Sequence, residues 1–128
     1  MKFVFIRLAA ALVAVTAAPV VFVGTAHADD DDVERRGSCG NAMSWKVKAK
    51  PDDGRIQVEA EIDSNRSGQR WGWVLSHNGS FSALGTSWTS GPSGSWEVKR
   101  STVDAPGTDT FRFRATHRRA VCVAIVSY

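Results

Sequence analysis

Apolar and polar residues alternate along most of the chain after Met43, with the two-residue period of β-strands. No stretch of this region shows the 3.6-residue period of an amphipathic helix. Segments rich in Gly, Pro, Asn and Asp interrupt the alternation repeatedly and indicate turns between strands. The pattern therefore predicts an all-β, antiparallel β-sandwich of about seven strands, at 43–50, 55–62, 70–76, 81–89, 95–103, 111–116 and 121–128.

Segment 70–76 is expected to be the central strand, because Trp71, Trp73 and Leu75 fall on one face. Large indole rings on one face need a second layer to cover them, which favours a sandwich over a single sheet. We interpret Trp71 and Trp73 as a packed core pair. The alternative is an exposed aromatic platform on which a sugar ring or a base stacks.

The first two predicted strands should form a hairpin around Pro51–Gly54, a segment with the residue types of a four-residue turn. This closure places Lys46 opposite Glu59 on one face and Val47 opposite Val58 on the other. The lysines of the first strand are therefore expected to be neutralised by the glutamates of the second.

Two later segments differ in how much burial their patterns indicate. Segment 81–89 is interrupted by Gly85 and is rich in Ser and Thr, which favours a weak edge strand. It follows Asn78-Gly79, the strongest short-range signal of a hairpin turn. Segment 121–128 is apolar on both faces, which favours a buried strand.

Residues 1–28 have the pattern of a secretory signal peptide. Two basic residues precede an apolar run at 8–24, and Ala26 and Ala28 satisfy the small-residue rule for cleavage. A short membrane anchor is the alternative for a run of this length. An acidic tract directly after Ala28 favours export and cleavage, which leaves no transmembrane anchor.

Residues 29–40 carry five acidic side chains and lack an apolar period, so we expect a flexible acidic leader before a β-sandwich domain at 41–128. The charge of the chain is unevenly distributed. From Arg35 onward 14 basic residues face eight acidic ones, a formal net charge of +6. A basic body of this kind suits an anionic partner.

The two cysteines, Cys39 and Cys122, both lie in the predicted exported part of the chain. An oxidising compartment favours a disulfide between them, which would connect the start of the domain to its last strand. The alternative is a free reactive thiol. A redox enzyme is not expected, because no third cysteine is present to resolve a mixed disulfide.

Arginines gather in the second half of the chain. If Phe111 and Phe113 face the core, the arginines between them point outward on the sheet that holds segment 70–76. Few carboxylates are placed to neutralise them, so they could bind an anionic wall polymer, lipid headgroups or nucleic acid, or serve only as a solubilising face. The candidate binding face consists of Arg70, Arg112, Arg114, Arg118 and Arg119.

Candidates for catalysis are few. After the signal peptide, His77 and His117 are the remaining histidines, and both are expected to be solvated turn residues. The chain has no G-x-S-x-G, H-E-x-x-H, phosphate-binding Gly-rich loop or Cys-x-x-Cys motif. We therefore expect no catalytic residues, no metal ligands and no cofactor.

The third predicted strand, with its tryptophans, and the corner at 104–115, with its Phe-Arg-Phe-Arg-Ala strand, resemble immunoglobulin-like and fibronectin-III-like domains. The likeness extends over the predicted β-region, but neither cysteine lies on the second or sixth predicted strand, as antibody domains require. The export signal and short basic domain are similar to small secreted proteins of uncharacterised function from high-GC Gram-positive bacteria. The resemblance implies an immunoglobulin-like β-sandwich and an extracellular location, and it implies no activity.

These patterns predict a secreted, non-catalytic binding module whose partner is an anionic cell-wall polymer or an extracellular protein. One alternative is a protease inhibitor that presents a rigid loop, at 91–95 or 64–69. The other is a carbohydrate-binding module, for which Trp88 in the weak edge strand is the candidate aromatic contact.

Overall fold

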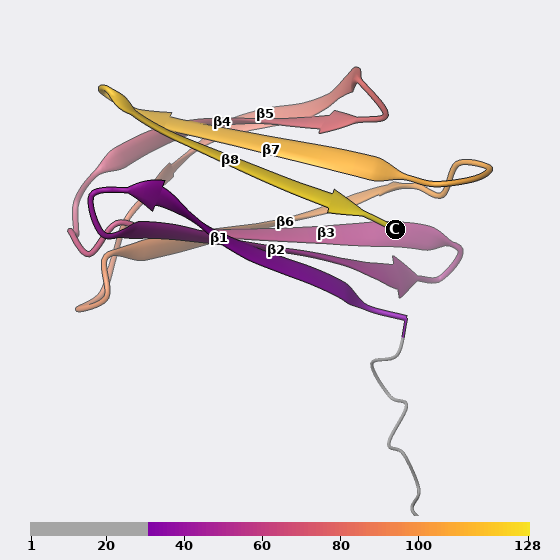
Figure 1. Ribbon diagram of the computed structural model, residues 1–128, viewed down its shortest axis with the longest axis horizontal. Coiled ribbons are helices and arrows are strands. Elements are labelled where there is room, and N and C mark those ends of the chain that lie inside the picture. Colours follow the sequence, from indigo (N-terminus) through magenta and orange to yellow (C-terminus); the bar gives the residue numbers. More distant parts are fainter. Residues whose placement is uncertain (1–30) are drawn as a thin grey trace, which may run out of the picture.

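A computed structural model describes residues 31–128, which form two layers of β-strands (Figure 1). The predicted signal peptide at 1–28 lies outside these described residues. Within them, no helix is long and apolar enough to cross a membrane. The strands are β1 (Val33–Gly40), β2 (Met43–Asp52), β3 (Arg55–Asp63), β4 (Arg70–His77), β5 (Ser80–Trp88), β6 (Ser95–Val103), β7 (Thr110–His117) and β8 (Ala120–Ser127).

The strands form two four-stranded sheets with the orders β1-β2-β3-β6 and β5-β4-β7-β8, and every pairing is antiparallel. Figure 1 shows the two sheets stacked face to face. β3 lies beside β6, and β7 lies between β4 and β8, so each sheet pairs strands that are distant in the sequence. The predicted all-β sandwich is confirmed, with β1 as an eighth strand.

The inward faces of both sheets meet in one apolar core. Trp71 and Trp73 are almost fully buried, so their interpretation as a packed core pair is correct. The Trp71 ring lies 6.3 Å from the Trp96 ring of the other sheet, and the Trp73 ring lies 5.5 Å from the Phe113 ring. Trp96 also lies 5.8 Å from the Phe113 ring, so Trp96 of β6 joins its sheet to both β4 and β7 of the other sheet, whereas the Trp73–Phe113 contact lies within one sheet.

The expected flexible leader at 29–40 is wrong for its second part, because residues 33–40 form β1. β1 pairs along its length with β2, which supplies partners for its backbone groups. Gly37 lies opposite Trp45, and the indole lies so close to Gly37 that a Cβ there would overlap it. Residues 33–40 do not have a strand pattern of their own, because the residues that pair with and pack on β1 belong to β2.

The predicted register of the first hairpin is wrong by two residues. The turn is the two-residue segment Asp53-Gly54, and Lys46 pairs with Glu61 instead of Glu59. Both turn residues have positive φ, 49° and 77°, which gives the backbone twist that two-residue hairpins require. The lysine and glutamate faces still meet, so the predicted neutralisation holds in the shifted register.

The edges of the second sheet are β5 and β8. The prediction of an edge strand at 81–89 is therefore confirmed, whereas the prediction of a buried strand at 121–128 is wrong. Val121 and Ile125 on the outer face of β8 are exposed, while the alternate residues of that strand are buried. A strand that is apolar on both faces need not be central when its outer face remains uncovered.

The predicted disulfide is present between Cys39 of β1 and Cys122 of β8, with the two Cα atoms 5.0 Å apart. β1 and β8 are edge strands of different sheets and lie along the same side of the sandwich. The bridge therefore joins the two layers directly. Within the described residues no cysteine is free.

Candidate binding surface

The outer face of the β5-β4-β7-β8 sheet holds the arginines selected by the sequence pattern. Trp71 and Trp73 on β4 and Phe113 on β7 point into the core, so their neighbours along each strand point outward. The five side chains are all exposed: Arg70, Arg112, Arg114, Arg118 and Arg119.

Two of these arginines lie in the middle of the face. Arg114 pairs with Val74 of β4 on one side and with Val123 of β8 on the other. Arg112 occupies the same strand two residues away and pairs with Ile125 of β8. Residues two apart on a strand have Cα atoms about 7 Å apart, so the two guanidinium groups can contact neighbouring groups of one ligand.

The other three arginines lie toward one end of the face. Arg70 begins β4, and Arg118 and Arg119 form the turn between β7 and β8. The imidazole Nδ1 of His117 lies 2.6 Å from the backbone oxygen of Arg70 and joins these two segments. The structure thus brings residues 48 positions apart in the sequence to the same end of the sheet.

This sheet contains no negative charge. None of the strands β4, β5, β7 and β8 contains an aspartate or a glutamate. Within residues 31–128, none of the five arginines forms an ion pair with a carboxylate. The positive potential of the face is therefore not cancelled by its own sheet.

The opposite sheet, β1-β2-β3-β6, has a different charge pattern. Glu59 on β3 lies between Lys50 at 3.1 Å, Lys48 at 3.6 Å and Lys99 at 3.8 Å. Burial raises the pKa of the Glu59 carboxyl, but the Lys50 hydrogen bond and the three ammonium charges outweigh burial and hold the pKa below 4.5. The lysines of this face are thus paired, and they leave little charge for a ligand.

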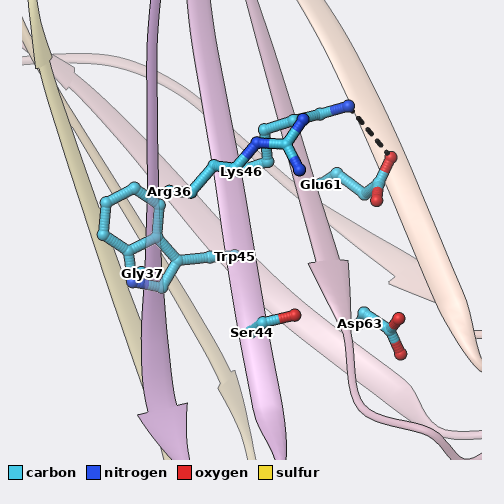
Figure 2. Close-up of a pocket in the computed structure, with 7 residues that line it drawn as sticks. All are labelled: Arg36, Gly37, Ser44, Trp45, Lys46, Glu61 and Asp63. Atoms are coloured by element: carbon cyan, nitrogen blue, oxygen red, sulfur yellow. Dashed lines mark ion pairs between the residues drawn. The ribbon is translucent and has the colours of Figure 1, made fainter.

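A shallow hollow of about 280 Å³ lies on the same side, beside β1, β2 and β3. Figure 2 shows the indole of Trp45 over β1 at Gly37, and the Lys46 ammonium paired with Glu61 at 3.8 Å. The hollow is lined by two basic and two acidic side chains, together with neutral residues. A balanced lining of this kind offers no preference for an anion or a cation.

His77 is not a solvated turn residue, which corrects the expectation from sequence. Its Nε2 lies 2.5 Å from Oδ1 of Asp109, and its ring stacks on Phe111. Asp109 is 1% exposed and also accepts a hydrogen bond from the backbone of Ala105. Among the described residues, no group of three His, Cys, Asp or Glu side chains could hold a metal ion. The pair fixes the corner before β7.

His117 is also more ordered than a solvated turn residue. Its ring stacks on Trp71 with the centroids 5.5 Å apart, and its Nδ1 contacts the Arg70 backbone. The expectation failed for both histidines for one reason. Their partners, Asp109 for His77 and Trp71 for His117, are distant in sequence, and no local pattern indicates them.

Trp88, the candidate aromatic contact, lies at the end of edge strand β5 and is 59% exposed. It pairs with Arg70 of β4, so an indole and a guanidinium are neighbours on the outer face. Sequence reasoning selected Trp88 but not the other exposed apolar side chains of the same sheet. Those residues are Val74, Phe81, Leu84, Val121 and Ile125.

The two loops considered for protease inhibition are bound to each other. The Ser64 amide donates to the Gly94 oxygen at 2.9 Å, and the hydroxyl of Ser67 donates to the Gly91 oxygen. The segments 64–69 and 91–95 therefore form one hydrogen-bonded cluster at an end of the sandwich. Neither loop stands alone as an extended strand that a protease cleft could bind.

Comparisons with known proteins add no family assignment. No protein-family model matches the chain, and no curated protein or solved structure matches it. Function is therefore inferred from the residues and geometry described above.

Proposed function

We propose that the chain is a secreted, non-catalytic module that binds an anionic component of a cell surface through its arginine-rich face, Arg70, Arg112, Arg114, Arg118 and Arg119. One observation carries the proposal: five exposed arginines share a sheet that contains no aspartate or glutamate. Guanidinium groups bind phosphate and carboxylate oxygens through paired hydrogen bonds. A polyanion such as a wall polymer supplies many such oxygens in a row.

The distribution of charge over the two faces supports this assignment. A chain with a merely solubilising surface would carry paired charges on both faces, as the opposite sheet does around Glu59. Here five exposed arginines share a sheet whose strands carry no carboxylate, whereas the strands of the other sheet carry both basic and acidic side chains. This separation produces a directed field that orients the protein toward a negatively charged surface.

Export is supported by two features. The signal-like pattern at 1–28 precedes the folded domain, and the Cys39–Cys122 disulfide is compatible with an oxidising, extracellular compartment. A protein outside the cell meets polyanions of the wall and envelope first. The proposed ligand class and the proposed location are therefore consistent.

The test is retention on an immobilised anionic polymer, such as polyphosphate or a teichoic acid, across a salt gradient. The double variant Arg112→Ala with Arg114→Ala should elute at lower salt and bind about tenfold more weakly, because it removes two phosphate contacts. The control Arg35→Ala with Arg36→Ala removes the same charge from exposed positions on β1. Equal loss in both variants, or no loss in either, would contradict a specific role for this face.

Carbohydrate recognition through Trp88 is a second candidate, favoured by its exposed indole on an edge strand. A sugar ring stacking on this indole should quench tryptophan fluorescence, and Trp88→Ala should abolish the quenching. Trp71, Trp73 and Trp96 are buried, so they provide an internal reference that a surface ligand does not reach.

A further inference from the structure

The arginine-rich face also carries apolar side chains, which binding to a soluble polyanion does not require. Six of the seven large hydrophobic residues exposed in the described chain belong to the β5-β4-β7-β8 sheet. The exception is Val103 on β6. The six are Val74, Phe81, Leu84, Trp88, Val121 and Ile125.

The most exposed of these residues lie on β5. Phe81 and Leu84 are each 65% exposed and Trp88 is 59% exposed. In the strand register Leu84 pairs with Val74 and Trp88 pairs with Arg70, so both project from the outer face. Phe81 pairs with Ser76 beyond a bulge, at the other end of the strand. Edge strand β5 therefore carries three exposed apolar side chains and no charged residue. We call these three residues, Phe81, Leu84 and Trp88, the apolar ridge.

The arginines lie beside this ridge. Arg112 and Arg114 are on β7, which is separated from β5 by β4 alone, at a distance of about 10 Å. An arginine side chain can lie along an apolar surface while its guanidinium reaches a polar layer. The face can thus present apolar groups and cations to the same flat partner.

A lipid bilayer with anionic headgroups matches this combination. Its phosphates attract arginines within a Debye length of the surface, and the absence of carboxylates on the sheet leaves no repulsion. Its headgroup region accommodates indole rings, which have an apolar body and a polar N–H. A wall polymer offers the charge but no apolar region for Leu84 and Trp88.

We propose that the anionic surface component is a lipid membrane, onto which the outer face of the β5-β4-β7-β8 sheet docks with Leu84 and Trp88 in the headgroup layer and the arginines on lipid phosphates. This inference rests on the proposed function, since it assigns the partner of the same face. It goes further by giving the apolar ridge on β5 a role in binding.

The experiment measures sedimentation of the mature protein with vesicles of phosphatidylcholine, either alone or with about one third phosphatidylglycerol. Binding is expected to the anionic vesicles only. Raising the salt to about 0.5 M should weaken binding without abolishing it, because apolar contacts are not screened. Trp88 fluorescence should shift to the blue on binding, and Trp88→Phe should lose that shift.

Variants separate the two contributions. Leu84→Ser with Trp88→Ser should weaken binding to the anionic vesicles about tenfold and leave retention on immobilised polyphosphate unchanged. Arg112→Ala with Arg114→Ala should weaken both. The matched control is Val103→Ser, which removes a similarly exposed apolar residue, 57% exposed, from the other sheet and should change neither.

Two outcomes would overturn the inference, and they differ from failure of the proposed function. Polyphosphate binding without vesicle binding would identify a polymer as the partner and leave the proposed function standing. Vesicle binding that salt abolishes, with no blue shift and no effect of the Leu84 and Trp88 changes, would show a purely ionic contact. Failure to bind any anionic probe would reject the proposed function itself.

Discussion

Gly85 of β5 lies directly beneath the indole of Trp73 on β4. A Cβ at Gly85 would lie 2.5 Å from Cζ2 of that ring, far closer than two carbon atoms can approach. In the sequence pattern, Gly85 interrupts the alternation of the strand predicted at 81–89. Its role is to admit the indole, which fills the core against Phe113.

Gly85→Ala should therefore destabilise the domain by about 1–3 kcal/mol, the usual cost of overpacking a core. Urea denaturation followed by circular dichroism measures the change. Gly72→Ala is the matched control, because the nearest heavy atom to a Cβ there is 3.9 Å away. The prediction is wrong if the two alanine variants are equally stable.

Removal of the disulfide should lower the melting temperature strongly. Cys39 and Cys122 are 83 residues apart in sequence, and closing a loop of that length is worth about 4–5 kcal/mol in the chain-entropy model. For a domain of this size, Cys39→Ser with Cys122→Ser should lower the melting temperature by about 15 °C or more. The far-UV signal should stay β-rich at low temperature. Two free thiols in the purified protein, or an unchanged melting curve after the double substitution, would contradict the prediction.

Asp109 should be more important for stability than its neighbours in the same loop. Asp109→Ala removes the acceptor for His77 Nε2 and for the Ala105 amide, which should cost about 1–3 kcal/mol for groups left unsatisfied. Asp104→Ala, at an exposed position five residues earlier, should have little effect. Thermal unfolding of both variants tests whether the contact between His77 and Asp109 stabilises the fold.

Glu59 should contribute stability that depends on pH. Its pKa is lowered in the folded protein below 4.5, so the contribution is present above about pH 4.5 and is lost as the pH falls through the folded value. Glu59→Gln should cost up to about 1 kcal/mol near neutral pH and little in acid.

Unfolding free energies measured at several pH values test this prediction. Glu97→Gln is the control, because Glu97 is more exposed and has one lysine partner instead of three. A loss in Glu59→Gln that is the same at every pH would indicate lost packing rather than lost charge.

Much of the fold was predictable because alternation reports directly which side of a strand is buried. The bounds of β6 agree with the predicted strand at 95–103, and the Asn78-Gly79 turn takes the positive φ values that its residue types favour. Trp71 and Trp73 were placed correctly for the same reason. Each of these features is encoded within a few residues.

The features that sequence reasoning missed depend on partners distant in the chain. β1 forms because β2 supplies hydrogen-bond partners for its backbone and Trp45 packs on Gly37. The sequence of residues 33–40 by itself has the pattern of a polar leader. His77 is partly buried and held by Asp109, which lies 32 residues later in the sequence. The position of a strand within its sheet also depends on residues distant in sequence, so the prediction of a buried strand at 121–128 was wrong.

The candidate surface was predictable in its charges but not in its apolar part. Arg112 and Arg114 were assigned outward from the phenylalanines that alternate with them. Leu84 was not predicted as a surface contact because segment 81–89 has the pattern of a weak polar strand. Val121 and Ile125 were not predicted because segment 121–128 was expected to be buried on both faces. The strand order, which the sequence does not reveal, places these apolar residues on the same sheet as the arginines.

The disulfide also determines how the protein would respond to mechanical tension. Cys39 and Cys122 are joined covalently, so a force that pulls the two ends of the chain apart passes through the sulfur–sulfur bond. The residues between them, which include β2 to β7 and all five arginines of the arginine-rich face, carry none of that load. Among residues 31–128, only the parts of β1 and β8 outside the bridge can be extended. A protein held at one end and pulled at the other would keep its arginine-rich face folded until the bridge itself breaks.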